Sequence, residues 1–167
     1  MQAELVIKNG LVILETGEVI TDVAVQGGKI VAIGQDLSGE RVIDATGLVA
    51  SPGMVDAHVT DPGGGYRDEW EGYVTGTAAC AKGGVTTFME MPLNQIPATV
   101  DKTSLEIKYK AGENKLKVDV GSFGGVVPTN LAGGIQELDE GGVSGYKCFL
   151  GTCGDRSIEG DFQNVDD

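Results

Sequence analysis

The chain has 167 residues, 41% of them hydrophobic and 22% charged, which is typical of a soluble globular protein with one or two domains. A formal net charge of −13 argues against nucleic acid as a partner, because phosphate binding needs clustered basic residues and the 12 lysines and arginines are scattered. No apolar run could cross a bilayer and no signal-peptide pattern opens the chain, so we expect no membrane partner. Three cysteines without a C-x-x-C pair (Cys80, Cys148 and Cys153) favour reduced thiols in the cytoplasm.

Residues 1–50 are expected to form a small antiparallel β unit. Short runs rich in valine and isoleucine, such as "ELVIKNG" and "LVILETGEVI", are separated by turn residues. "DVAVQ" alternates apolar and polar side chains, and "QGGK" supplies the two glycines of a hairpin turn. No helical period competes with this pattern.

Residues 51–167 change to a series of alternating strands and helices. We expect strands in "GMVDAH", "VTTFMEM", "LKVDVGSFGGVV" and "VSGYKCFLG". Helices are expected in "DEWEGYVTGTAACAKGG", which starts with acidic residues and ends in glycines, in "DKTSLEIKYKAGENK" with Asp101 as N-cap, and in "TNLAGGIQELDEGG". The fold class is therefore α/β with a parallel sheet.

Four such strands fit two architectures. They could form an open doubly wound sheet, or the first four βα units of a TIM-type (β/α)₈ barrel, which needs eight strands. Periodicity alone does not separate the two. A half barrel would leave unpaired strand edges, which favour self-association into a homo-oligomer.

The only histidine, His58, stands at the C-terminal end of the first strand of this series. Ligands and catalytic groups gather at that end of parallel sheets. The ordinary interpretation is a hydrogen-bonded histidine at a strand end, and position alone slightly favours it. Asp56 and Asp61 add oxygen atoms nearby, but without a second histidine the cluster is a weak metal signal.

Lys147 interrupts the apolar strand "VSGYKCFLG". Either its stem is buried and its ammonium reaches the mouth of the sheet, or desolvation keeps the amine neutral and reactive. The loop after the second strand, residues 89–101, brings Glu90, Asn94 and Gln95 to the same mouth, where Asn94 is a candidate for binding substrate. A rigid connecting loop without function is the alternative for these three.

Taken in order, these stretches resemble the cyclic amidohydrolases, and most closely the members that open the hydantoin ring of allantoin. The resemblance covers the whole chain, from "LVIKNG" and "GGKIVAIG" through "SPGMVDAH" to "AKGGVTT". Its most specific segments are "EMPLNQ" and "KCF..TCGD". Single glycine motifs would be weak evidence, whereas this ordered series is specific.

The resemblance implies a β-sandwich built from both chain ends beside a barrel that holds two divalent metal ions, commonly zinc. Residues 1–50 would be the sandwich portion and residues 51–167 the partial barrel. His58 matches the first histidine of an H-x-H pair on the first strand, and Lys147 matches a lysine that is carboxylated and bridges the metals. The implied reaction is hydrolysis of a cyclic ureide, allantoin to allantoate, in purine catabolism.

The sequence departs from this family pattern in two places. Thr60 stands where the second histidine belongs, or else two residues have dropped out before "TDPG". The chain also ends before the strands expected to supply two more histidines and the aspartate base, so the catalytic base is not assigned and the chain alone is expected to be inactive. Two alternatives stay open, namely a non-catalytic relic that serves as a structural or interaction module, and a dihydropyrimidinase or hydantoinase substrate.

Overall fold

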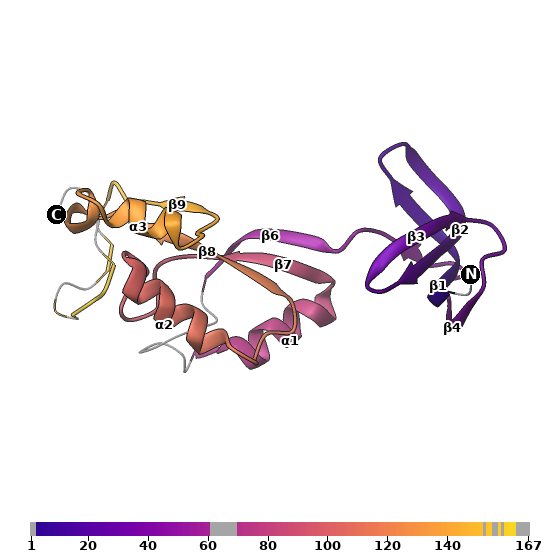
Figure 1. The fold of residues 1–167 in the computed structure, drawn as a ribbon, viewed down its shortest axis with the longest axis horizontal. Helices are drawn as coiled ribbons and strands as arrows, with labels where there is room; N and C mark the ends of the chain where they lie inside the picture. The colour runs from indigo at the N-terminus through magenta and orange to yellow at the C-terminus, as the bar shows by residue number, and fades with distance from the viewer. Residues whose placement is uncertain (1–2, 61–69, 152, 155–156, 158, 163–167) are drawn as a thin grey trace. The chain divides into compact units, whose positions relative to one another are not determined.

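A computed structural model describes residues 3–60, 70–151, 153–154, 157 and 159–162 of the chain. These residues form two compact units, Met1–Pro52 and Gly53–Asp167 (Figure 1). No described helix is long and apolar enough to cross a membrane, since α1 and α2 have only 11 residues each.

The N-terminal unit is a five-stranded mixed sheet with the order β3-β2-β1-β4 and β5 beside β1. Its strands are β1 (Ala3–Leu14), β2 (Gly17–Gln26), β3 (Lys29–Gly34), β4 (Gly39–Asp44) and β5 (Val49–Ala50). The expected hairpin between β2 and β3 is confirmed, with Gly27 and Gly28 at positive φ in the turn.

The fully antiparallel arrangement expected for this unit is wrong for two of its strand pairs. β1 pairs with β4 and with β5 in parallel. Turn signals report only the direction of strands that follow each other directly, whereas β4 and β5 return to β1 from further along the chain. The unit's core is small and built around Ala3, Val6 and Ala24.

The C-terminal unit is a parallel sheet with the strand order β6-β7-β8-β9. Its elements are β6 (Met54–Val59), α1 (Tyr73–Gly83), β7 (Val85–Glu90), α2 (Lys102–Gly112), β8 (Asp119–Gly125), the 3₁₀ turn η2 (Pro128–Asn130), α3 (Gly134–Glu140) and β9 (Gly145–Lys147). This is the expected alternation of strands and helices, and α1 and α2 lie on the same side of β7 in Figure 1.

Local sequence chemistry determines most of the helix ends in this unit. Asp101 is the N-cap of α2 as expected, and it forms a capping box with Ser104. Gly84 closes α1 in the left-handed conformation, with φ of 89°. The acidic start expected for the first helix is wrong, because α1 begins at Tyr73 and carries no acidic residue in its first turn.

Candidate metal and substrate site

His58 and Lys147 meet at the carboxyl end of the C-terminal sheet. They lie 89 positions apart in the sequence, yet the Nε2 of His58 and the Nζ of Lys147 are 3.4 Å apart. Their strands, β6 and β9, are the two outer strands of the sheet, with β7 and β8 between them.

This contact requires a curled sheet. In a flat sheet, three strand spacings would separate β6 from β9 by roughly 14 Å. Side chains that stand perpendicular to a flat sheet would keep that separation. The two side chains therefore lie on the concave face of a parallel half barrel, which decides between the two architectures that periodicity left open.

Lys147 is held in place by backbone pairing and by an aromatic ring. Its carbonyl oxygen accepts a hydrogen bond of 2.8 Å from the Val126 N–H. Its Nζ lies 5.1 Å from the ring centroid of Phe149, which in turn packs edge-on against the buried Phe162. Burial lowers the pKa of the Lys147 amine below its usual value, which increases the fraction of neutral amine at a given pH.

His58 is fixed by its own strand. Its backbone N–H donates to Oδ1 of Asp56 at 2.9 Å, so one oxygen of that carboxylate is engaged in a hydrogen bond within β6. The next carbonyl group, of Val59, accepts a hydrogen bond of 3.0 Å from the Met91 N–H, which ties the end of β6 to the residue after β7. Asp61, the other candidate oxygen donor, lies outside the described residues.

The loop between β7 and α2 is held by hydrogen bonds among its own residues. The Nε2 of Gln95 donates to the Pro97 carbonyl at 2.9 Å and to the Thr99 hydroxyl at 2.8 Å, while Gln95 Oε1 is enclosed without a hydrogen-bond partner. Gln95 is therefore a loop-bracing residue, and in the part of the chain that the structure describes no hydrogen bond joins it to His58 or Lys147. Asn94 is half-buried with φ of 72°, and among the described residues no hydrogen bond joins it to His58 or Lys147.

Glu90 departs from its expected place at the mouth. Its side chain is 2% exposed and turns toward the helices. Glu90 Oε2 accepts a hydrogen bond of 2.6 Å from the Tyr73 hydroxyl and lies 3.5 Å from the Lys108 ammonium. Lys108, itself 1% exposed, also donates to the Met91 carbonyl at 2.9 Å.

This buried network of Tyr73, Glu90 and Lys108 was missed from the sequence. The signal was present in α2, because Lys108 falls on the same helical face as the buried Leu105 and Gly112. The network joins α1, β7 and α2, and through the Met91 carbonyl it fixes the first residue of the loop that carries Asn94.

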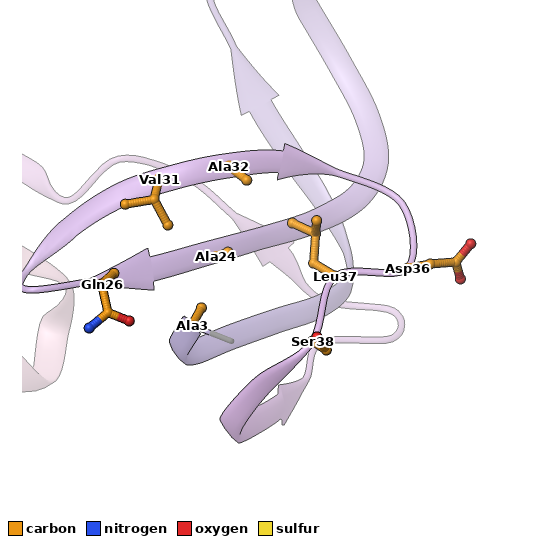
Figure 2. Close-up of a pocket in the computed structure, with 8 residues that line it drawn as sticks. All are labelled: Ala3, Ala24, Gln26, Val31, Ala32, Asp36, Leu37 and Ser38. Atoms are coloured by element: carbon orange, nitrogen blue, oxygen red, sulfur yellow. The ribbon is translucent and has the colours of Figure 1, made fainter. Parts of the chain in front are cut away.

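The N-terminal unit has a pocket of about 290 Å³, shown in Figure 2, that contains none of the candidate residues. Its lining is mostly small and apolar, with Ala3, Ala24, Gln26, Val31, Ala32, Asp36, Leu37 and Ser38. Asp36 points away from the other side chains in Figure 2. A pocket with this lining offers no acid–base pair and no set of metal donors. The candidate for a catalytic or metal-binding site is therefore the His58–Lys147 pair.

Known proteins resemble this chain along its whole length. It is 98% identical over 169 aligned positions to an allantoinase of Enterococcus faecalis, and 68% and 57% identical to allantoinases of Bacillus licheniformis and Escherichia coli. Each alignment covers 100% of this chain. By sequence, the chain resembles these allantoinases. It matches their N-terminal portion and spans 37% of the length of these relatives. No family model matches it.

Solved structures of hydantoinases share the fold of this chain. An L-hydantoinase (dihydropyrimidinase) from Arthrobacter aurescens superposes with a TM-score of 0.81 at 30% identity, over 98% of this chain and 36% of that protein. A D-hydantoinase (dihydropyrimidinase) from a Thermus species gives a TM-score of 0.72 at 28% identity, over 89% of this chain and 33% of that protein. The segment thus shares the fold of part of these hydantoinases, a small mixed sheet followed by a half barrel.

The described residues do not fit a pair of divalent metals. They contain no group of three or more His, Cys, Asp or Glu side chains placed to hold a metal ion. One imidazole and one amine meet at the mouth, whereas even a single zinc ion usually takes three or four protein donors.

Proposed function

We propose that this chain is the N-terminal portion of a metal-dependent hydrolase that opens the hydantoin ring of allantoin to give allantoate, a step of purine catabolism. The convergence of His58 and Lys147 carries the proposal, because two potential donors from distant strands lie 3.4 Å apart at one mouth. Mouths of this kind, at the carboxyl ends of barrel strands, hold active sites.

His58 and Lys147 are proposed as metal donors of the complete enzyme, for a pair of divalent ions such as zinc. Lys147 would serve after carboxylation, in which the neutral amine attacks carbon dioxide and releases a proton. The lowered pKa of this amine supports that role, because only the neutral form carries the lone pair that attacks. Asn94 is proposed to bind the cyclic ureide, because its loop follows β7 at the same end of the sheet.

The segment of residues 1–167 is proposed to have no activity alone. Its described residues supply two of the donors and no catalytic base, so neither an activated water nor a polarised carbonyl is provided. Incubation of the purified chain with zinc and allantoin, followed by a colorimetric assay for allantoate, should give the same rate as a protein-free blank. Sustained turnover at one zinc ion or more per chain would contradict this expectation.

The proposed roles can be tested in the full-length Enterococcus faecalis relative, which is 98% identical to this chain. Alanine at the positions of His58 and Lys147 should each reduce allantoin hydrolysis to background and lower the zinc content measured by mass spectrometry. Alanine at the position of the exposed Lys110 is the matched control and should change neither. Full activity and full zinc content after replacement of Lys147 would refute its role as a donor.

A second candidate substrate class is favoured by the solved structures, since the superposed proteins are hydantoinases and dihydropyrimidinases. The high identity to allantoinases supports allantoin instead. Comparison of kcat/KM for allantoin, hydantoin and dihydrouracil in the full-length relative separates the two, and we expect allantoin to be preferred. A further candidate is a non-catalytic structural or interaction module. It is favoured by Thr60, which stands where the second histidine of the H-x-H pair is expected.

The enzyme is proposed to be cytoplasmic, and this chain on its own is proposed to self-associate. Among the described residues, β6 and β9 each have a strand neighbour on one side only, and Met54 and Val55 of β6 are 55% and 66% exposed. Apolar, unpaired edges of this kind pair with other strands. Light scattering coupled to size-exclusion chromatography should therefore show a mass that rises with protein concentration, whereas a constant monomer mass would contradict self-association.

A further inference from the structure

The mouth of the half barrel lacks a second imidazole on β6. Two side chains of one strand reach the same metal only from the same face, which means positions i and i+2. His58 is at position i, and the strand continues as far as Val59, whose carbonyl accepts the Met91 N–H. Two positions after His58, directly beyond the end of β6, the chain has Thr60, whose hydroxyl is not among the imidazole, thiolate and carboxylate groups that hold zinc.

The comparison with the Enterococcus faecalis allantoinase gives a second, independent observation. That alignment spans 169 positions although this chain has only 167 residues, so the relative carries two residues that this chain lacks. At 98% identity the two sequences are otherwise almost the same, so these two residues are the main difference between them.

We infer that the two missing residues belong between Val59 and Thr60, and that one of them is the second imidazole donor of β6. This inference rests on the proposed function, from which the H-x-H pair is expected. A gap of two residues here explains why "TDPG" follows His58 so closely.

The consequence concerns the metal site of this particular chain. With Thr60 in place of an imidazole, the site remains incomplete even when the rest of an allantoinase is joined to it. The chain is therefore expected to differ from its relative in metal binding, and the length of the segment is not the only reason to expect no activity from it.

The test uses three forms of the chain, each also fused to the part of the Enterococcus faecalis relative that follows the matched segment. The first form is unchanged. The second carries two residues inserted between Val59 and Thr60, a histidine followed by isoleucine. The third is the matched control, with alanine followed by isoleucine at the same place, and it restores chain length without an imidazole.

We expect the fusions of the unchanged and alanine forms to show no allantoin hydrolysis and reduced zinc content by mass spectrometry, whereas the histidine form recovers both. Calorimetric titration of the three unfused chains with zinc gives a readout independent of activity, and only the histidine form should show a stronger affinity. A fully loaded, active unchanged fusion would overturn the inference, and so would recovery by the alanine form. If the histidine form recovers zinc without hydrolysing allantoin, and the unaltered relative is also inactive, the inference stands and the proposed substrate fails.

Discussion

The two units of this chain differ in amino-acid composition and in which side chains they bury. The N-terminal unit has no phenylalanine, tyrosine or tryptophan, and its core consists of alanine and valine with Leu37 packed against it. All nine aromatic residues follow residue 52, and the C-terminal unit contains the ion pair of Glu90 and Lys108, both of which are fully buried. The unit with the aromatic residues and this ion pair is also the one that brings His58 and Lys147 together.

This difference shows where a rigid site can be built. The N-terminal sheet leaves large apolar side chains exposed, for example Ile20 at 65% and Ile30 at 64%. The C-terminal unit holds its mouth loop with buried hydrogen bonds from Lys108, Gln95 and Asn130. The difference is also useful in the laboratory, because tryptophan and tyrosine fluorescence reports on the C-terminal unit alone.

The largest expected effect is that of breaking the buried ion pair. Lys108→Met removes the ammonium group that lies 3.5 Å from the buried Glu90 carboxylate, which should lower the free energy of unfolding of the C-terminal unit by about 3–5 kcal/mol. Urea unfolding followed by tyrosine and tryptophan fluorescence measures the change. Lys110→Met, on the exposed side of the same helix, is the control and should cost less than about 0.5 kcal/mol.

The charge itself can be separated from the packing of this network. In the double variant Glu90→Gln with Lys108→Met, neither charge remains and the Tyr73 hydroxyl keeps an acceptor, so much of the lost stability should return. If Lys108→Met alone proved as mild as Lys110→Met, the buried pair would not be what stabilises this unit.

A smaller effect is expected in the N-terminal unit from Asp22. This carboxylate is 2% exposed and accepts hydrogen bonds from the backbone N–H groups of Asn9 and Leu37, at 2.9 and 3.1 Å. Asp22→Ala leaves these donors unpaired and should cost roughly 1–3 kcal/mol. Amide hydrogen exchange should accelerate in β1 and β2 while the fluorescence unfolding curve stays unchanged. A shift of the fluorescence curve would show that the two units do not unfold independently.

The cap of α2 should contribute less again. Asp101 Oδ1 accepts a hydrogen bond of 2.7 Å from the Ser104 N–H, so Asp101→Ala should destabilise the C-terminal unit by about 1 kcal/mol. Fluorescence-detected urea unfolding checks this, with Glu106→Ala on the exposed face as the matched variant. Equal stability of the two variants would mean that the capping box is not needed for the helix.

The smallest effect on stability is expected from the exposed apolar face of the N-terminal sheet. Ile30→Thr should change the free energy of unfolding by less than about 0.5 kcal/mol, because Ile30 is 64% exposed. Val6→Ala, at a fully buried position, should instead lose much of the roughly 1.5–3 kcal/mol that burial of a valine provides. Hydrogen exchange in β1 and β2 compares the two variants, and a large effect of Ile30→Thr would show that this face is covered in solution.

Much of the fold was predictable because the signals are local. The order of strands and helices, the hairpin at Gly27 and Gly28 and the cap at Asp101 all follow from residues within a few positions of each other. The parallel pairing of β4 with β1 was not predictable in this way, because it joins segments far apart in the sequence.

The site was predictable only in part. His58 and Lys147 could be recognised by their positions at strand ends, but their approach to 3.4 Å depends on the curvature of the whole sheet, which no local pattern encodes. Glu90 was placed on the wrong side because a polar residue at a strand end suits either face. Its partners Lys108 on α2 and Tyr73 on α1 show which face it takes.

The most direct test is a nuclear Overhauser measurement on the purified chain. Because His58 is the only histidine, its imidazole protons give one unambiguous set of signals. With the Nε2 of His58 3.4 Å from the Nζ of Lys147, strong cross-peaks are expected between the imidazole and the ε-methylene protons of Lys147. An imidazole that shows cross-peaks only to residues of its own strand and of β7 would contradict the convergence of the two side chains.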